Sequence, residues 1–165
     1  MAASTTIKHF TDGSITLKDG TGTPVTLVVP FSQGDFSPAG IQETQQEVVA
    51  YQSRGVLHIV RHAAANFPTG SFSFMVADYA DATDQTAIDF LLKQGSFAAN
   101  VSTLGTNAEV YTVNIVLTIE GTDHGDAADH TITLTNCACT IDVAEGEPNT
   151  VTVNYTAYGG KPTFT

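Results

Sequence analysis

The segment from Gly40 to Asp78 is the part of the sequence that most constrains the fold. A polar, strand-like run at 41–51 continues through Arg54-Gly55 into an apolar strand that ends at His62. A strand with polar side chains on both faces is not expected inside a lone globule, because burial would remove water from polar groups without supplying partners. We therefore expect both faces of this strand to contact water or another subunit.

Alternation of apolar and polar residues predicts a protein built mainly of β-strands. The turn dipeptides Asp12-Gly13 and Asp19-Gly20 bracket the first of them. The predicted strands lie at 14–18, 24–30, 41–51, 54–62, 71–79, 109–121, 131–143 and 150–158. This pattern predicts an all-β, β-rich fold, an antiparallel β-sandwich that forms a barrel on oligomerisation.

One flanking α-helix is predicted at about 83–94. Thr83 or Asp81 is expected to cap its start, and Gly95 is expected to end it. An apolar stripe at helical spacing should cover the sheet, and it consists of Ala87, Ile88, Leu91 and Leu92. The length is typical of a single domain, which we assign to residues 1–165, with 1–6 and 159–165 as flexible ends.

The charge balance argues against several classes of partner. The chain has 17 acidic residues against 6 basic ones, a formal net charge of −11. Nucleic-acid binding by phosphate neutralisation needs clustered Lys and Arg, so specific DNA or RNA binding is not expected. The acidic balance also disfavours contact with anionic membranes.

The N-terminal residues lack the apolar run of a signal peptide, and no stretch is long enough for a transmembrane helix. We therefore expect the protein to fold in a cytoplasm. Cys137 and Cys139 share one face of a predicted strand at a separation that disfavours a disulfide, so we expect both thiols to be reduced.

Catalytic motifs are absent from the sequence, and we predict that the protein is not an enzyme. The run Asp19-Gly20-Thr21-Gly22 lacks both the spacing and the second carboxylate loop of an aspartic protease. No nucleophile-plus-base signature marks a hydrolase, which makes that class the least favoured. No cofactor is expected.

The densest group of potential metal ligands lies in a turn. It consists of Asp123, His124, Asp126, Asp129 and His130. These residue types could hold a divalent cation, but Asp and Gly also serve turn geometry, and we favour the turn. His58 and His62 share a strand face near Arg61, where we expect a boundary between core and interface.

The segment 41–78 resembles the major tail tube proteins of long-tailed, siphovirus-like bacteriophages. The matching features are a polar strand at 45–51, an Arg-Gly turn followed by a second Arg, a proline loop, a Ser/Phe strand and a short helix. The residues that carry the resemblance are Arg54, Gly55, Val56, Leu57, Arg61, Pro68, Phe72 and Phe74. Ser53 and the run from His62 depart from the family pattern, which has an acidic residue and a charged run there.

The resemblance implies a structural virion protein whose hexameric rings stack into a tube through which genome DNA passes without specific binding. It implies as partners further copies of the chain and the tape measure, terminator and tail tip proteins. The location would be the virion tail, assembled in the host cytoplasm. The resemblance also implies inter-subunit roles for the matching residues from Arg54 to Phe74.

The polar strand and the acid excess suggest which residues would line such a tube. Glu43 and Glu47 share a strand face and are predicted to face the lumen, and the face with Thr131, Thr133 and Thr135 is a second candidate. An acidic wall would keep DNA from adhering. Two alternatives stay open: a β-sandwich module that binds a glycan or a divalent metal, and the tube of a contractile tail or secretion system.

Overall fold

The computed structural model describes residues 13–29, 48–76, 86–121 and 127–165. The strands in this part of the chain are β1 (Gly13–Lys18), β2 (Thr26–Val29), β3 (Val48–Ser53), β4 (Val56–His62), β5 (Thr69–Met75), β6 (Val113–Ile119), β7 (His130–Ala144), β8 (Thr150–Ala157) and β9 (Thr163–Phe164). Helix α1 (Ala87–Leu92) and a 3-10 turn (Gly95–Phe97) lie between β5 and β6. None of the helices described here has the length and apolarity to span a bilayer.

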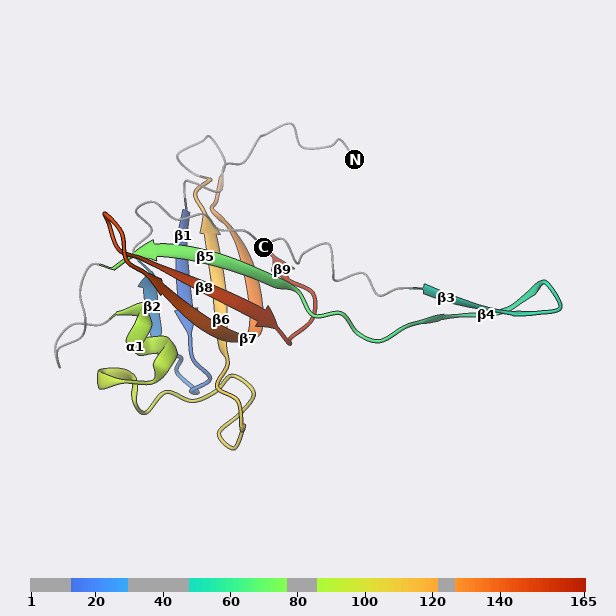
Figure 1. The fold of residues 1–165 in the computed structure, drawn as a ribbon, viewed down its shortest axis with the longest axis horizontal. Helices are drawn as coiled ribbons and strands as arrows, with labels where there is room; N and C mark the ends of the chain where they lie inside the picture. Colours follow the sequence, from blue (N-terminus) through green and yellow to red (C-terminus); the bar gives the residue numbers. More distant parts are fainter. Residues whose placement is uncertain (1–12, 30–47, 77–85, 122–126) are drawn as a thin grey trace.

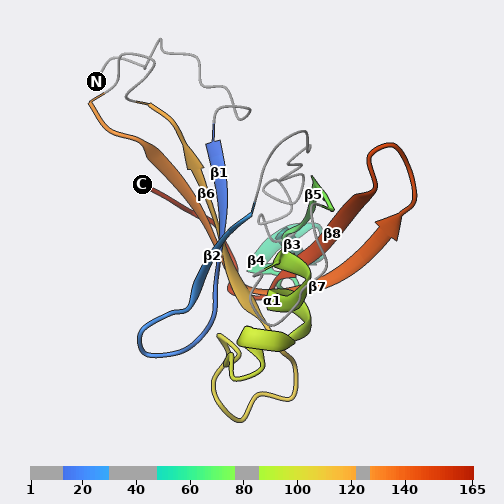
Figure 2. The same cartoon turned by 90° about the vertical axis from the view of Figure 1, so that its left-hand side faces the viewer.

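The main sheet is antiparallel, with the strand order β2-β1-β6-β7-β8-β5, and β9 pairs with β7. In Figure 1, β1 and β6 run steeply while β5 and β8 run across them, so the sheet folds over into two layers. Figure 2 shows these two layers from the side, with α1 at one end of the space between them. The predicted antiparallel β-sandwich with one flanking helix is therefore confirmed.

A bulge in β7 allows this one strand to serve both layers. Asn136 adopts a left-handed backbone conformation, with φ of 55°. Its N–H donates to Oδ1 of Asn114 on β6, at 3.0 Å. Before the bulge Ile132 and Leu134 point into the core, and after it the inward residue is Cys137. The bulge thus shifts the inward face by one residue where the strand turns from one layer into the other.

The core lies between the two layers and follows the predicted alternation. Phe72 and Phe74 on β5 are buried, as expected from the Ser/Phe strand. The predicted inward face of β6 is also buried, as is that of β1; the residues are Val113, Ile115, Leu117 and Ile119, with Ile15 and Leu17. Cys137 and Cys139 are free thiols, as predicted.

Helix α1 begins later than predicted. Thr86 is the N-cap, and its hydroxyl accepts a hydrogen bond from the N–H of Asp89 at 3.2 Å. The predicted caps Asp81 and Thr83 lie outside the described residues. The predicted apolar stripe was also wrong in part, because Leu92 is 52% exposed and Phe90 is fully buried instead. Phe90 packs edge-on against Phe97, with ring centroids 5.0 Å apart.

Strand β6 is shorter than the predicted strand at 109–121. Thr112 precedes β6 and is fully buried. Its hydroxyl lies 2.9 Å from that of Ser102 and 2.8 Å from that of Thr103, so it holds the 96–108 loop against the sandwich. At Thr112, hydrogen bonds between hydroxyl groups take the place of the strand pairing that the sequence predicted.

The C-terminal residues, expected in a flexible end at 159–165, extend the sheet. Thr163 and Phe164 pair with Thr133 and Ile132 of β7. Thr165 exchanges backbone hydrogen bonds with Thr131 at 2.7 and 3.0 Å. The end of the chain therefore occupies the position beside β7 that β8 leaves free.

Asp19 organises the turn between β1 and β2. Its side chain is buried, and its carboxylate accepts hydrogen bonds from the N–H of Val25 at 2.7 Å and of Val101 at 3.2 Å. The hydroxyl of Thr21 donates to the same carboxylate at 2.9 Å. Asp19 thus ties the first turn to the loop before β6, a structural role that explains the Asp-Gly-Thr-Gly run.

Replacing Asp19 with Ala should lower the free energy of unfolding by about 2–4 kcal/mol, because the N–H groups of Val25 and Val101 would lose a charged acceptor that joins two segments. Chemical denaturation followed by circular dichroism measures this loss. Glu109→Ala is the matched control, since Glu109 is exposed, and it should change stability by under about 0.5 kcal/mol. Equal losses in both variants would contradict the role given to Asp19.

Candidate functional site

The β3–β4 hairpin projects away from the sandwich (Figure 1). It forms a separate two-stranded sheet, with Val48 opposite His62 and Tyr51 opposite Ile59. Arg54 and Gly55 form its turn, and both have positive φ, 51° and 81°. This is the conformation of a type I′ turn, which matches the twist of a hairpin. The predicted Arg-Gly turn is therefore confirmed.

A bulge interrupts the hairpin at His58. Tyr51 pairs with Ile59, but the next residue, Gln52, pairs with Leu57. His58 is thus the extra residue on β4, and the strict alternation predicted for 54–62 is wrong at this point. Of the predicted polar strand at 41–51, only its end from Val48 is described.

The hairpin exposes apolar side chains on both of its faces. Val48, Ala50 and Val60 share one face, and Tyr51 and Ile59 share the other. Nearly every hairpin residue is exposed, with Val56 at 69% and Leu57 at 57% next to the turn. A two-stranded hairpin is marginally stable alone in water, and a contiguous exposed apolar patch marks an interaction surface. Both faces of the hairpin are therefore suited to being covered by protein.

The base of the hairpin is fixed to the sandwich. Pro68 is buried, and its carbonyl accepts a hydrogen bond from the N–H of Ala157 at 2.8 Å. The ring of Phe67 packs against Tyr158, with centroids 5.1 Å apart. The predicted proline loop therefore anchors the connection from β4 to β5 on the sandwich.

The other predicted site residues are spread over the molecule. Arg54, Gly55 and Arg61 lie in the hairpin. Phe72 and Phe74 are core residues that hold β5 in the sandwich, so they are not on the surface of this chain. Val48, Tyr51 and Ile59 are exposed hairpin residues that we did not predict as site residues, although their apolar character is visible in the sequence.

The predicted lumen residues are only partly described. Glu43 and Glu47 lie outside the described residues. Thr131, Thr133 and Thr135 lie on the face of β7 opposite Ile132 and Leu134, as predicted, and are half-buried. Nothing in their surroundings assigns them to a channel.

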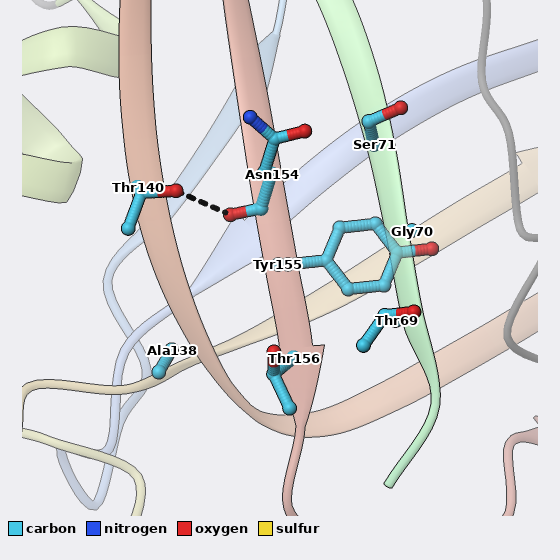
Figure 3. A pocket seen from close by; sticks show the side chains of 8 residues that line it. All are labelled: Thr69, Gly70, Ser71, Ala138, Thr140, Asn154, Tyr155 and Thr156. Atoms are coloured by element: carbon cyan, nitrogen blue, oxygen red, sulfur yellow. Dashed lines mark hydrogen bonds between the residues drawn. The ribbon is translucent and has the colours of Figure 1, made fainter.

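A shallow groove of about 380 Å³ lies on the outer face of β5, β8 and β7 (Figure 3). Its lining consists of Thr69, Gly70, Ser71, Ala138, Thr140, Asn154, Tyr155 and Thr156. The hydroxyl of Thr140 donates to the carbonyl of Asn154 at 3.5 Å. The lining contains no charged side chain, and its one titratable group is the phenol of Tyr155, which is buried and whose pKa is raised by that burial. Nothing in the lining is therefore arranged as an activated nucleophile with its base.

The predicted metal alternative gains no geometric support. Asp123, His124 and Asp126 lie outside the described residues. Oδ1 of Asp129 accepts a hydrogen bond from the N–H of Gly121 at 3.1 Å, a contact that joins the chain just after β6 to the residue before β7. Within the described ranges, no three His, Cys, Asp or Glu side chains are grouped as metal ligands would be.

Comparisons with known proteins add no relative. No protein-family model, curated protein or solved structure matches the chain.

Leu57→Ala and Leu117→Ala form a matched pair that tests whether the hairpin contributes to the stability of the monomer. Leu117 is buried on β6, so its truncation should cost about 2–5 kcal/mol. Truncation of Leu57 should change stability by under about 0.5 kcal/mol. Denaturant unfolding of dilute protein measures both values. A large loss at Leu57 in the monomer would show that the hairpin packs on its own sandwich.

Proposed function

We propose that this protein is a structural tail tube protein whose hexameric rings stack into a conduit for phage genome DNA. The observation that carries the proposal is the β3–β4 hairpin, which projects from the sandwich and exposes apolar side chains on both faces. An isolated globular protein gains nothing from such an element, whereas an assembly can bury it. The sequence resemblance at 41–78 supports the same conclusion.

Sheet edges also favour assembly. In the described part of the chain, β2, β5 and the short β9 each have one paired neighbour, so each presents an outer edge of the main sheet. An outer strand carries backbone groups that are free to pair with another chain. Adjacent subunits in a closed ring can supply those partners, which turns an edge that favours aggregation into a defined contact.

The charge of the chain suits a conduit for DNA. Six copies carry a formal charge of −66, six times the −11 of one chain. Acidic walls repel phosphate groups, so DNA can slide without being held. Glu43 and Glu47 are the proposed lumen residues, with the Thr131, Thr133 and Thr135 face as a second candidate.

Electron microscopy of the purified protein at high concentration tests the proposal. We expect rings or tubes with six-fold symmetry, because apolar hairpin surface becomes buried as copies associate. Sedimentation across a range of concentrations should show the same association. A protein that stays monomeric under all conditions would overturn the proposed function.

Reversing the charges of the proposed lumen residues tests whether these residues line the channel. A phage carrying Glu43→Lys together with Glu47→Lys should still form tubes, but its infectivity should fall because lysines would hold the passing DNA. Glu109→Lys is the control for one replacement of a carboxylate by a lysine at an exposed residue outside the proposed wall. Normal infectivity of the double variant would remove both residues from the wall.

A further inference from the structure

The hairpin carries positive charge, whereas the chain as a whole is strongly negative. Arg54 and Arg61 are the two arginines of the whole sequence, and no acidic residue occurs from Val48 to Pro68. Neither guanidinium forms an ion pair with any residue that the structure describes. A basic, apolar element on an acidic chain is complementary to an acidic protein surface that also exposes apolar groups.

Such a surface lies at the turn between β7 and β8. Asp142, Glu145 and Glu147 are exposed there, and Val143 is 56% exposed beside them. The sequence has no Lys or Arg from 94 to 160 to offset these carboxylates. None of the three forms an ion pair within the described ranges. This end of the sheet therefore offers negative charge, which the hairpin lacks, together with an exposed apolar side chain.

The two surfaces lie at opposite ends of the molecule. The hairpin leads into β5 at Thr69, which pairs with Thr156 of β8. The other end of β5, Met75, pairs with Thr150, which directly follows the β7–β8 turn. The length of β5, about 20 Å at ~3.3 Å per residue, therefore separates the two surfaces, in agreement with Figure 1. They cannot meet within one chain as it is folded.

We propose that the β3–β4 hairpin of one copy docks on the β7–β8 turn of the next copy, with Arg54 and Arg61 facing the carboxylates of Asp142, Glu145 and Glu147. The inference rests on the proposed self-assembly and deepens it, because it names the surfaces that meet. A contact between two different surfaces is head-to-tail, so it propagates from copy to copy and closes into a ring where the rotation permits. Val56 and Leu57 beside the hairpin turn supply apolar surface to cover Val143.

Charge reversal on each surface tests the contact. Arg54→Glu with Arg61→Glu reverses the hairpin, and Glu145→Arg with Glu147→Arg reverses the turn. Each double variant alone should need a roughly tenfold or higher concentration to assemble, since like charges would meet at the contact. A mixture of the two variants should assemble again, because each reversed surface then meets a complementary one. Sedimentation and electron microscopy measure both effects.

A control variant distinguishes loss of the proposed contact from the effect of a changed net charge. Lys93→Glu with Lys161→Glu changes the net charge as much as the hairpin reversal but lies outside both surfaces, and it should assemble like the unaltered protein. If mixing fails to restore assembly, or if the turn reversal has no effect, the hairpin docks elsewhere and the inference is overturned. DNA binding that is lost on hairpin reversal would assign the hairpin to nucleic acid instead, and would also overturn it.

Cross-linking gives a readout that does not require rings. Chains with Val56→Cys, mixed with chains carrying Val143→Cys, should form a covalent dimer with a short bismaleimide. Leu104→Cys, 52% exposed in the loop before β6, replaces Val143→Cys in the control and should not cross-link. Burial raises the pKa of the Cys137 thiol to about 12 and also raises the pKa of Cys139. Both native thiols therefore stay protonated and react slowly near neutral pH.

The outcomes distinguish the inference from the proposed function. A specific cross-link in a protein that never forms rings or tubes would support the contact and overturn the tube function. Six-fold rings without the cross-link and without any effect of charge reversal would support the tube function and overturn the contact. A protein without rings and without the cross-link would overturn both.

Discussion

The left-handed turn of the backbone at Asn136 is the constraint on which the two-layer fold depends. Without it, the long strand β7 would keep one face inward along its whole length and could not pass from the β6 layer to the β8 layer. The side chain of Asn114 fixes the bulge by accepting the Asn136 N–H. Asn tolerates positive φ better than most residues, so the sequence permits the bulge where the fold requires it. The layer that carries β5, and through β5 the hairpin, is positioned by this one feature.

Side-chain alternation was enough to predict most strands, because Ile15, Leu17, Phe72 and Phe74 alternate with residues that face water. The predicted element boundaries were wrong where several polar side chains could cap the same helix, or where a side chain makes tertiary hydrogen bonds. Asp81, Thr83 and Thr86 are all good N-caps, and the packing of the buried Phe90 selects a start that local sequence leaves open. The start of the strand predicted at 109–121 was wrong for a similar reason, since the buried hydroxyl contacts of Thr112 are tertiary and have no local signature.

The candidate surface was predictable in part. The Arg54-Gly55 turn is a local signal, and so is the absence of a catalytic motif. The separation of the hairpin from the sandwich was not predictable, because apolar strands such as 56–62 normally indicate burial within the same chain. The bulge at His58 also depends on pairing across the hairpin rather than on any one residue. Of the polar strand that first suggested an interface, only the end from Val48 is described, so the structural evidence comes from the apolar strand that follows it.

A hairpin that contributes little to the core allows folding and association to be controlled separately. The sandwich buries its own apolar residues, so the chain can fold before it meets another copy. The hairpin then supplies apolar area and the only guanidinium groups, while the rest of the chain stays strongly acidic. Like-charged copies repel one another at most orientations, and this repulsion suppresses random association. The orientation that we propose, with a basic hairpin against an acidic turn, would escape that repulsion, so the same charge that disfavours aggregation would favour a single, directional contact.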